Sequence, residues 1–132
     1  MVARDISVCP CGTGTPYAAC CGAYHRGAKA LTAEALMRSR YSAFVRGLPE
    51  YLHTTWSVQT RPRVSELPST GMPFTRLEIL RTQGGGPFDA EGIVEFAAYS
   101  PTGVQHEVSR FIREDSAWVY LDGDVRSPLR AD

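Results

Sequence analysis

The sequence predicts a protein of the α+β class, in which helices pack on an antiparallel sheet of about four strands and a small cysteine-rich segment precedes them. Two observations lead to this architecture. Apolar residues recur at helical spacing up to residue 56 and with a period of two beyond residue 73. All four cysteines fall between residues 9 and 21. We therefore expect a cysteine-rich unit over residues 1–30 and an α+β domain over residues 31–132.

The cysteines form the pattern C-x-C-x8-C-C, as Cys9, Cys11, Cys20 and Cys21. Four thiolates so close in sequence can complete a tetrahedral shell around one zinc ion. Two disulfides are the alternative, but the N-terminus shows no apolar signal segment, and a cytoplasmic chain keeps its thiols reduced. His25 could also replace one thiolate. Four protein ligands leave no position for water, so we expect a structural zinc in a cytoplasmic protein.

The first element expected in the α+β domain is a helix over residues 33–46. Thr32 suits the N-cap position, and Gly47 can end the helix in a left-handed conformation. The expected apolar face comprises Ala33, Leu36, Met37, Tyr41, Ala43 and Phe44, and the expected solvent face comprises Arg38, Ser39, Ser42 and Arg46.

A second, shorter helix should begin at Pro49 and run to about Trp56. Residues 57–73 contain three prolines and few apolar positions, so we expect a long connection with one helical turn near residues 64–67. Turn signals then separate four segments of alternating polarity, which predict an antiparallel meander. The expected strands are residues 74–82, 93–99, 104–113 and 118–121.

Composition restricts the classes of partner. The 14 cationic residues balance 14 acidic ones, so the formal net charge is zero. A broad nucleic-acid-binding surface usually has a basic excess, and we therefore expect no nucleic-acid partner. No apolar run approaches the roughly eighteen residues that a membrane crossing requires, so we expect no membrane span.

The segment from Cys9 to Cys21 resembles the SEC-C motif, a zinc knuckle found in many SecA translocation ATPases and in other bacterial proteins. It shares the four cysteines, the Cys-Pro-Cys-Gly start and Tyr17. The resemblance implies that the four cysteines bind zinc. In that motif, contacts with ribosomes, phospholipid and the SecB chaperone depend partly on lysines. Four positions that often hold lysine are uncharged here: Thr15, Pro16, Ala18 and Ala19.

The remainder of the chain resembles the YchJ-like family of uncharacterised bacterial proteins. The segments that carry the resemblance are residues 20–25, 32–44, 51–56, 94–96, 107–111 and 118–123. It implies a body similar to the nuclear transport factor 2-like fold, in which a curved sheet wraps around helices to form a cone with a cavity. Cones of this kind serve as enzymes, ligand receptors and dimerisation modules, so the fold does not decide the function.

Arg40 is the most unusual residue of the body, because it projects from the middle of an apolar helix face. A buried guanidinium needs a carboxylate or several carbonyls as partners. We expect Glu95 or Glu107, on neighbouring strands, to pair with it, either as an internal strut or as part of an anion-binding pocket. Tyr41 and Trp56 could line the same pocket.

The sequence favours a zinc-binding protein that acts as a binding or adaptor module, with a protein or a small molecule as its partner. One alternative is a small-molecule-binding protein or an enzyme that uses the cavity of the cone. Another is a translation- or export-associated factor that acts through the knuckle. No catalytic motif is recognisable, so the non-enzymatic interpretation is favoured.

Overall fold

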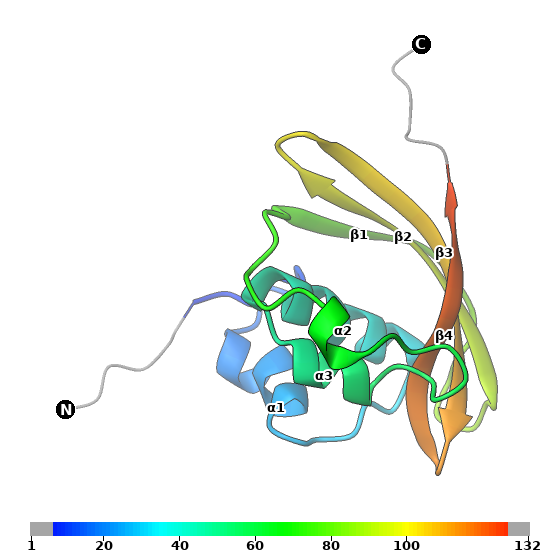
Figure 1. Cartoon of the computed structure of the whole chain (residues 1–132). Helices are drawn as coiled ribbons and strands as arrows, with labels where there is room; N and C mark the ends of the chain where they lie inside the picture. The colour runs from blue at the N-terminus through cyan, green and yellow to red at the C-terminus, as the bar shows by residue number, and fades with distance from the viewer. Residues whose placement is uncertain (1–6, 127–132) are drawn as a thin grey trace.

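The computed structural model describes residues 7–126, which form a curved sheet with helices packed against its concave side (Figure 1). The elements are η1 (Tyr17–Ala19), α1 (Cys21–His25), α2 (Ala33–Arg46), α3 (Pro49–Thr54), η2 (Val64–Glu66), β1 (Arg76–Gly84), β2 (Glu91–Ser100), β3 (Gly103–Glu114) and β4 (Ala117–Arg126). The prediction of an α+β fold with helices on one antiparallel sheet is confirmed.

The sheet is a four-stranded meander in the order β1-β2-β3-β4. Phe96 of β2 lies opposite Glu107 of β3, and Phe111 of β3 lies opposite Tyr120 of β4. Directly opposed residues share a face of the sheet, and neighbours along a strand alternate between faces. The register therefore places Glu107 on the concave face with Phe96, and Glu95 on the convex face.

The two helices of the body begin and end where local chemistry dictates. Thr32 caps α2 by accepting a hydrogen bond from the Ala35 N–H at 3.0 Å, and Gly47 ends the helix at φ 69°. Pro49 occupies the first turn of α3, which ends at Thr54, two residues before the predicted end. The predicted helical turn in the long connection is η2.

Strand β4 extends five residues beyond its predicted end at residue 121. Asp-Gly is a common turn sequence, but here Gly123 continues the strand and pairs with Ser109. A Cβ at Gly123 would lie 2.2 Å from the Glu107 Oε2 atom, so this glycine permits a close approach rather than a chain reversal.

The predicted solvent face of α2 is wrong for two of its four residues. Ser39 and Ser42 are 0% exposed. The cysteine-rich unit of residues 7–30, called the knuckle below, packs over this side of the helix, while the sheet packs over the other. The Ser39 hydroxyl donates to the Leu36 carbonyl and contacts the Tyr51 hydroxyl at 2.6 Å. Helix α2 is therefore a central helix with two buried faces.

One apolar core joins the knuckle to the sheet. It contains Cys9, Cys11 and Cys21 together with residues of α2 and of the strands, among them Leu36, Met37, Leu77, Val94, Phe96, Phe111 and Trp118. The knuckle is therefore part of the folded core, and its cysteines lie beside side chains of the body.

Strand β4 is attached to the helical layer at several points. The backbone N–H of Tyr120 donates to the Thr55 carbonyl at 2.8 Å, and the Ser57 N–H donates to the Tyr120 carbonyl at 2.8 Å. The Trp118 indole N–H donates to the Leu31 carbonyl at 3.2 Å. None of the helices within residues 7–126 combines the length and apolar character of a membrane span.

Candidate metal centre and body cavity

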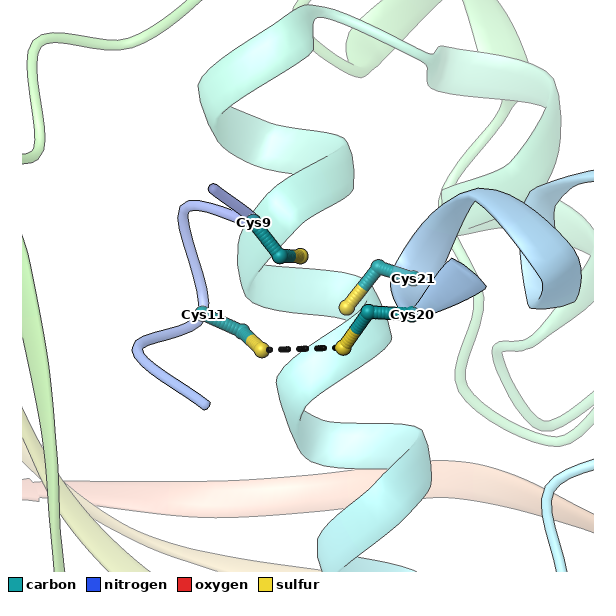
Figure 2. Close-up of side chains that lie close together, drawn as sticks. All are labelled: Cys9, Cys11, Cys20 and Cys21. Carbon is teal, nitrogen blue, oxygen red and sulfur yellow. Dashed lines mark hydrogen bonds between the residues drawn. The ribbon is translucent and has the colours of Figure 1, made fainter. Parts of the chain in front are cut away.

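The four cysteines come together at one point beside α2. Cys9 and Cys11 lie on the loop before η1, and Cys20 and Cys21 lie at the start of α1, with their sulfur atoms facing one another (Figure 2). All four Sγ atoms lie within 4.8 Å of one another, and those of Cys11 and Cys20 are 3.6 Å apart. Zinc–sulfur bonds of about 2.3 Å in a tetrahedron place neighbouring sulfurs about 3.8 Å apart, so the arrangement fits one zinc ion.

Short backbone contacts shape the loop that carries the first two cysteines. The Cys9 N–H donates to the Thr15 carbonyl at 2.8 Å, which closes the loop on itself. Gly12 turns the chain at φ 91°, a conformation that favours glycine. A Cβ at Gly22 would lie 2.7 Å from the Tyr17 carbonyl oxygen, so glycine after Cys21 lets α1 pack closely on η1.

Ionisation of the Cys11 thiol opposes ionisation of Cys20 and Cys21. Cys9, Cys11 and Cys21 are buried. A hydrogen bond from the Cys21 thiol lowers the pKa of Cys11, while the same contact and burial raise the pKa of Cys21. One thiolate is thus stabilised at the expense of its neighbours, and a bound dication would compensate the repulsion among four.

The knuckle docks on the polar side of α2 through one contact at almost every turn. Arg38 Nη1 donates to the Cys11 carbonyl at 2.7 Å, and the Ser42 hydroxyl lies 3.4 Å from the Cys9 sulfur. Near the end of the helix, the Arg46 guanidinium stacks 3.9 Å from the centre of the Tyr17 ring. These contacts orient Cys9 and Cys11, and helical periodicity did not indicate them because it placed this side of α2 in solvent.

His25 joins α1 to α2 and lies outside the group of four cysteines. Its Nε2 atom donates to the Ser39 carbonyl at 2.9 Å, and the Tyr17 hydroxyl donates to its Nδ1 atom. The ring also packs edge-on against Tyr51. With both nitrogens engaged in hydrogen bonds, His25 positions the knuckle, whereas the sequence had left open that it binds the metal.

Burial lowers the pKa of His25, and this predicts a pH dependence of stability. In the unfolded chain the histidine titrates near 6.5, so below about that pH the unfolded state binds the extra proton. The stabilisation from neutral His25 is complete above this pH and is lost as the pH falls below it. We expect urea denaturation between about pH 7.5 and 5.5 to show a larger loss of stability in the wild type than in His25→Gln. Equal losses in the two proteins would contradict this role.

A cavity of about 240 Å³ lies on the other side of α2, between the helix and the concave face of the sheet. Its walls are mostly apolar, and its polar groups come from α2, β3, β4 and the indole of Trp56. The lining residues are Met37, Arg40, Tyr41, Phe44, Trp56, Met72, Phe74, Phe96, Ala98, Gln105, Glu107, Ser109 and Tyr120. Four of the five predicted pocket residues, Arg40, Tyr41, Trp56 and Glu107, are among them.

Arg40 is buried, but the predicted ion pair with Glu95 or Glu107 is wrong. Its Nη1 atom donates to the Leu52 carbonyl at 2.9 Å and to the Thr55 hydroxyl at 2.7 Å. The guanidinium also lies between two rings, 5.0 Å from the centre of Trp56 and 4.8 Å from that of Tyr120. The end of α3 and two aromatic faces thus take the place of a carboxylate.

Glu107 is held by hydroxyl groups on the opposite wall. Ser109 donates to its Oε2 atom at 2.6 Å, and the Tyr120 hydroxyl donates to the same atom at 3.0 Å. Burial and the nearby carboxylate raise the pKa of Tyr120, so its hydroxyl stays protonated as a donor at neutral pH. Tyr120 thereby contacts both charges of the cavity, since its ring also stacks on Arg40.

The placement of Glu95 in the pocket is also wrong. Glu95 lies on the convex face, where it accepts hydrogen bonds from His106 at 2.7 Å and from Arg81 at 3.1 Å. These bonds lower the pKa of its carboxyl group. The alternation of a β-strand explains the difference, because the observed register places Glu95 and Glu107 on opposite faces.

Comparison with known proteins matches both parts of the chain. Residues 32–123 match a family model described as the YchJ middle domain, nuclear transport factor 2-like, and residues 7–23 match the SEC-C motif. A UPF0225 protein of Corynebacterium efficiens is 53% identical over 121 residues, covering 89% of this chain and 92% of that protein. A UPF0225 protein of Streptomyces coelicolor is 53% identical over 117 residues, covering 88% and 94%.

A solved structure shares the fold as well. It is the solution structure of a SEC-C motif containing protein from Rhodopseudomonas palustris, with a TM-score of 0.72 and 28% sequence identity. The likeness covers 92% of this chain and 100% of that one.

Proposed function

Since the chain belongs to the YchJ-like family of UPF0225 proteins, with a SEC-C motif and a nuclear transport factor 2-like domain, we propose that it is a zinc-ordered binding module of the cytoplasm. The observation that carries the proposal is the convergence of four cysteine sulfurs within 4.8 Å. A site made only of thiolates suits zinc, and its persistence requires a reducing compartment.

The zinc has a structural role in this proposal. Four cysteines fill a tetrahedral shell and leave no position at which water or a substrate could bind the metal. The ion would join the loop of Cys9 and Cys11 to the start of α1, and the contacts of Arg38, Ser42 and His25 would then hold that unit on α2. The module binds a partner and does not act as an enzyme.

We expect one zinc ion per chain in protein purified without added metal, because the four sulfurs already lie close to tetrahedral spacing. Elemental analysis gives the stoichiometry, and X-ray absorption should give zinc–sulfur distances of about 2.3 Å. Thr13→Ser, which keeps a hydroxyl beside the sulfurs, should bind the same amount and serves as the control. Metal-free protein with the knuckle still folded, or with two disulfides after reduced handling, would refute the proposal.

We expect only weak binding to nucleic acid. The chain has no net charge, and four positions of the knuckle that often hold lysine are uncharged. Affinity for RNA or duplex DNA at physiological salt should therefore be no tighter than the non-specific range of about 10⁻⁴–10⁻⁶ M. A sub-micromolar affinity that falls steeply with salt in fluorescence anisotropy would instead support the role in translation or export.

The cavity supports a second candidate function, the binding of a small molecule. It contains a buried guanidinium for which the described residues provide no carboxylate within ion-pair distance. Pockets that bind small molecules are typically apolar with a few convergent polar groups, and this cavity has that character. Here the helices and the sheet form the receptor, and the knuckle secures the outer side of α2.

A further inference from the structure

The cavity contains more hydrogen-bond donors than its own walls can satisfy. The described residues accept hydrogen bonds from Nη1 of Arg40, but they provide no partner for Nε or Nη2. The indole N–H of Trp56 is buried and has no hydrogen-bond partner within residues 7–126 either. Both residues line the cavity. Buried donors without partners are costly, so an acceptor that occupied the cavity would be strongly favoured.

We propose that this cavity binds a small apolar carboxylate, whose oxygens accept hydrogen bonds from Arg40 and from the Trp56 indole. The proposal rests on the second candidate function and names the ligand class for it. A guanidinium presents parallel N–H groups that match the two oxygens of a carboxylate. Burial lowers the pKa of Arg40 only to about 10, so the group keeps its charge at neutral pH.

The remaining walls define the rest of the ligand. Besides Trp56 and Tyr120, seven lining side chains are apolar or aromatic: Met37, Tyr41, Phe44, Met72, Phe74, Phe96 and Ala98. The volume of about 240 Å³ is slightly below the ~300–1,000 Å³ of common small-molecule pockets, so a ligand with one ring fits its scale. Gln105 is exposed while Glu107 and Ser109 on the same strand face are buried, so this polar row leads from solvent into the cavity.

Glu107 is the group that could favour a different ligand. Its carboxylate could attract a cation, but its Oε2 atom already accepts two hydrogen bonds, from Ser109 and Tyr120. Within residues 7–126 no acceptor contacts Nε or Nη2 of Arg40 or the buried indole N–H of Trp56, so the unmet demand is for acceptors. We therefore expect an anionic head group to bind more tightly than a neutral or a cationic one.

The test compares three ligands that share one ring: benzoate, benzamide and benzylamine. We expect benzoate to give saturable shifts of amide signals from the cavity residues in NMR titrations of the zinc-loaded protein. A hydrogen bond to a charged group is stronger than one between neutral groups, so benzoate should bind at least about tenfold more tightly than benzamide. Benzylamine should bind more weakly than either.

Four variants locate the effect. Arg40→Met should reduce benzoate affinity at least about tenfold and bring it near that of benzamide. Trp56→Phe keeps a ring but removes the indole N–H, and it should weaken benzoate more than benzamide. Ala98→Leu fills the cavity and should abolish binding of all three ligands. Arg76→Met is the matched control, because Arg76 also stacks on a ring, that of Tyr99, but lies outside the cavity.

The outcomes distinguish an error in the ligand class from an error in the choice of the cavity as the binding site. If benzamide or benzylamine binds as tightly as benzoate, the cavity is a binding site but the carboxylate class is wrong. If none of the three ligands shifts the cavity signals, or if Ala98→Leu leaves binding unchanged, the cavity is not the binding site. The proposed ligand class and the second candidate function are then both wrong. Loss of benzoate binding in Arg76→Met would likewise overturn the assignment to Arg40.

Discussion

Replacing Cys11 with serine is expected to release the zinc, unfold the knuckle and lower the melting temperature of the whole protein. Cys11 is fully buried and belongs to the same core as residues of α2 and the sheet. A site of this kind does not exist in the unfolded chain, so the free energy of metal binding contributes to folding. Its apparent value is about 10–16 kcal/mol in zinc-finger peptides. If only about 3 kcal/mol of it supports the body, the melting temperature should fall by roughly 10 °C.

Calorimetry measures the fall in melting temperature, and hydrogen exchange shows which part of the protein unfolds. Amides of residues 7–30 should lose protection first, while the amides of β2 and β3 keep most of theirs because the strands have their own apolar contacts. Thr13→Ser alters the same loop without removing a sulfur and should leave both readouts unchanged. An unchanged melting temperature in Cys11→Ser would mean that the knuckle contributes nothing to the body.

The second large effect is expected at Arg40, where alanine should cost far more stability than methionine. Alanine removes the two hydrogen bonds to the end of α3 and the packing between Trp56 and Tyr120. We expect a loss on the order of 3 kcal/mol. Methionine keeps most of the apolar stem, and it removes a charge that has no ion-pair partner among the described residues, so its cost should be about 1 kcal/mol.

Urea denaturation of both variants gives the comparison directly. A similar cost for alanine and methionine would show that the charge, rather than the packing of the stem, stabilises this part of the protein. Stability close to that of the wild type in Arg40→Met would also make that variant a folded protein for ligand titrations.

The sequence predicted those parts of the fold that depend on local chemistry. The N-cap at Thr32 and the glycine at position 47 define α2 without reference to the rest of the molecule. The alternation of apolar residues and the turn signals give a meander, whose strands contact their sequence neighbours. The cluster of four cysteines is likewise local, since one short segment brings their sulfur atoms together.

The parts that the sequence did not predict depend on contacts between distant segments. A helical wheel distinguishes one buried face, and it cannot recognise a helix such as α2 that is covered on two sides. Ser39 and Ser42 are small residues at a spacing of three, which suits close packing of another segment, and this was the available signal. The contact of His25 with Ser39 and that of Arg46 with Tyr17 become evident only when the knuckle is docked on α2.

The charges of the cavity illustrate the same limit. Alternation placed Glu95 and Glu107 on strands, but only the register between β2 and β3 shows which of them faces the helices. The partners of Arg40 depend on where α3 ends, because the Leu52 carbonyl is one of the free acceptors at a helix terminus. Neither the register between β2 and β3 nor the partners of Arg40 can be read from one segment alone.

The attachment of β4 to the helical layer has a consequence for how the chain folds. Hairpins between consecutive strands close short loops and form quickly, whereas the Trp118 contact with Leu31 spans 87 residues. Ribosomes synthesise β4 after the other elements within residues 7–126, so its backbone hydrogen bonds with Thr55 and Ser57 form only after those elements have been made. Tyr120 forms one wall of the cavity and arrives with that strand. Nascent chains that lack β4 therefore already contain all four cysteines while one wall of the cavity is absent, so the cavity is completed only after the last cysteine has been synthesised.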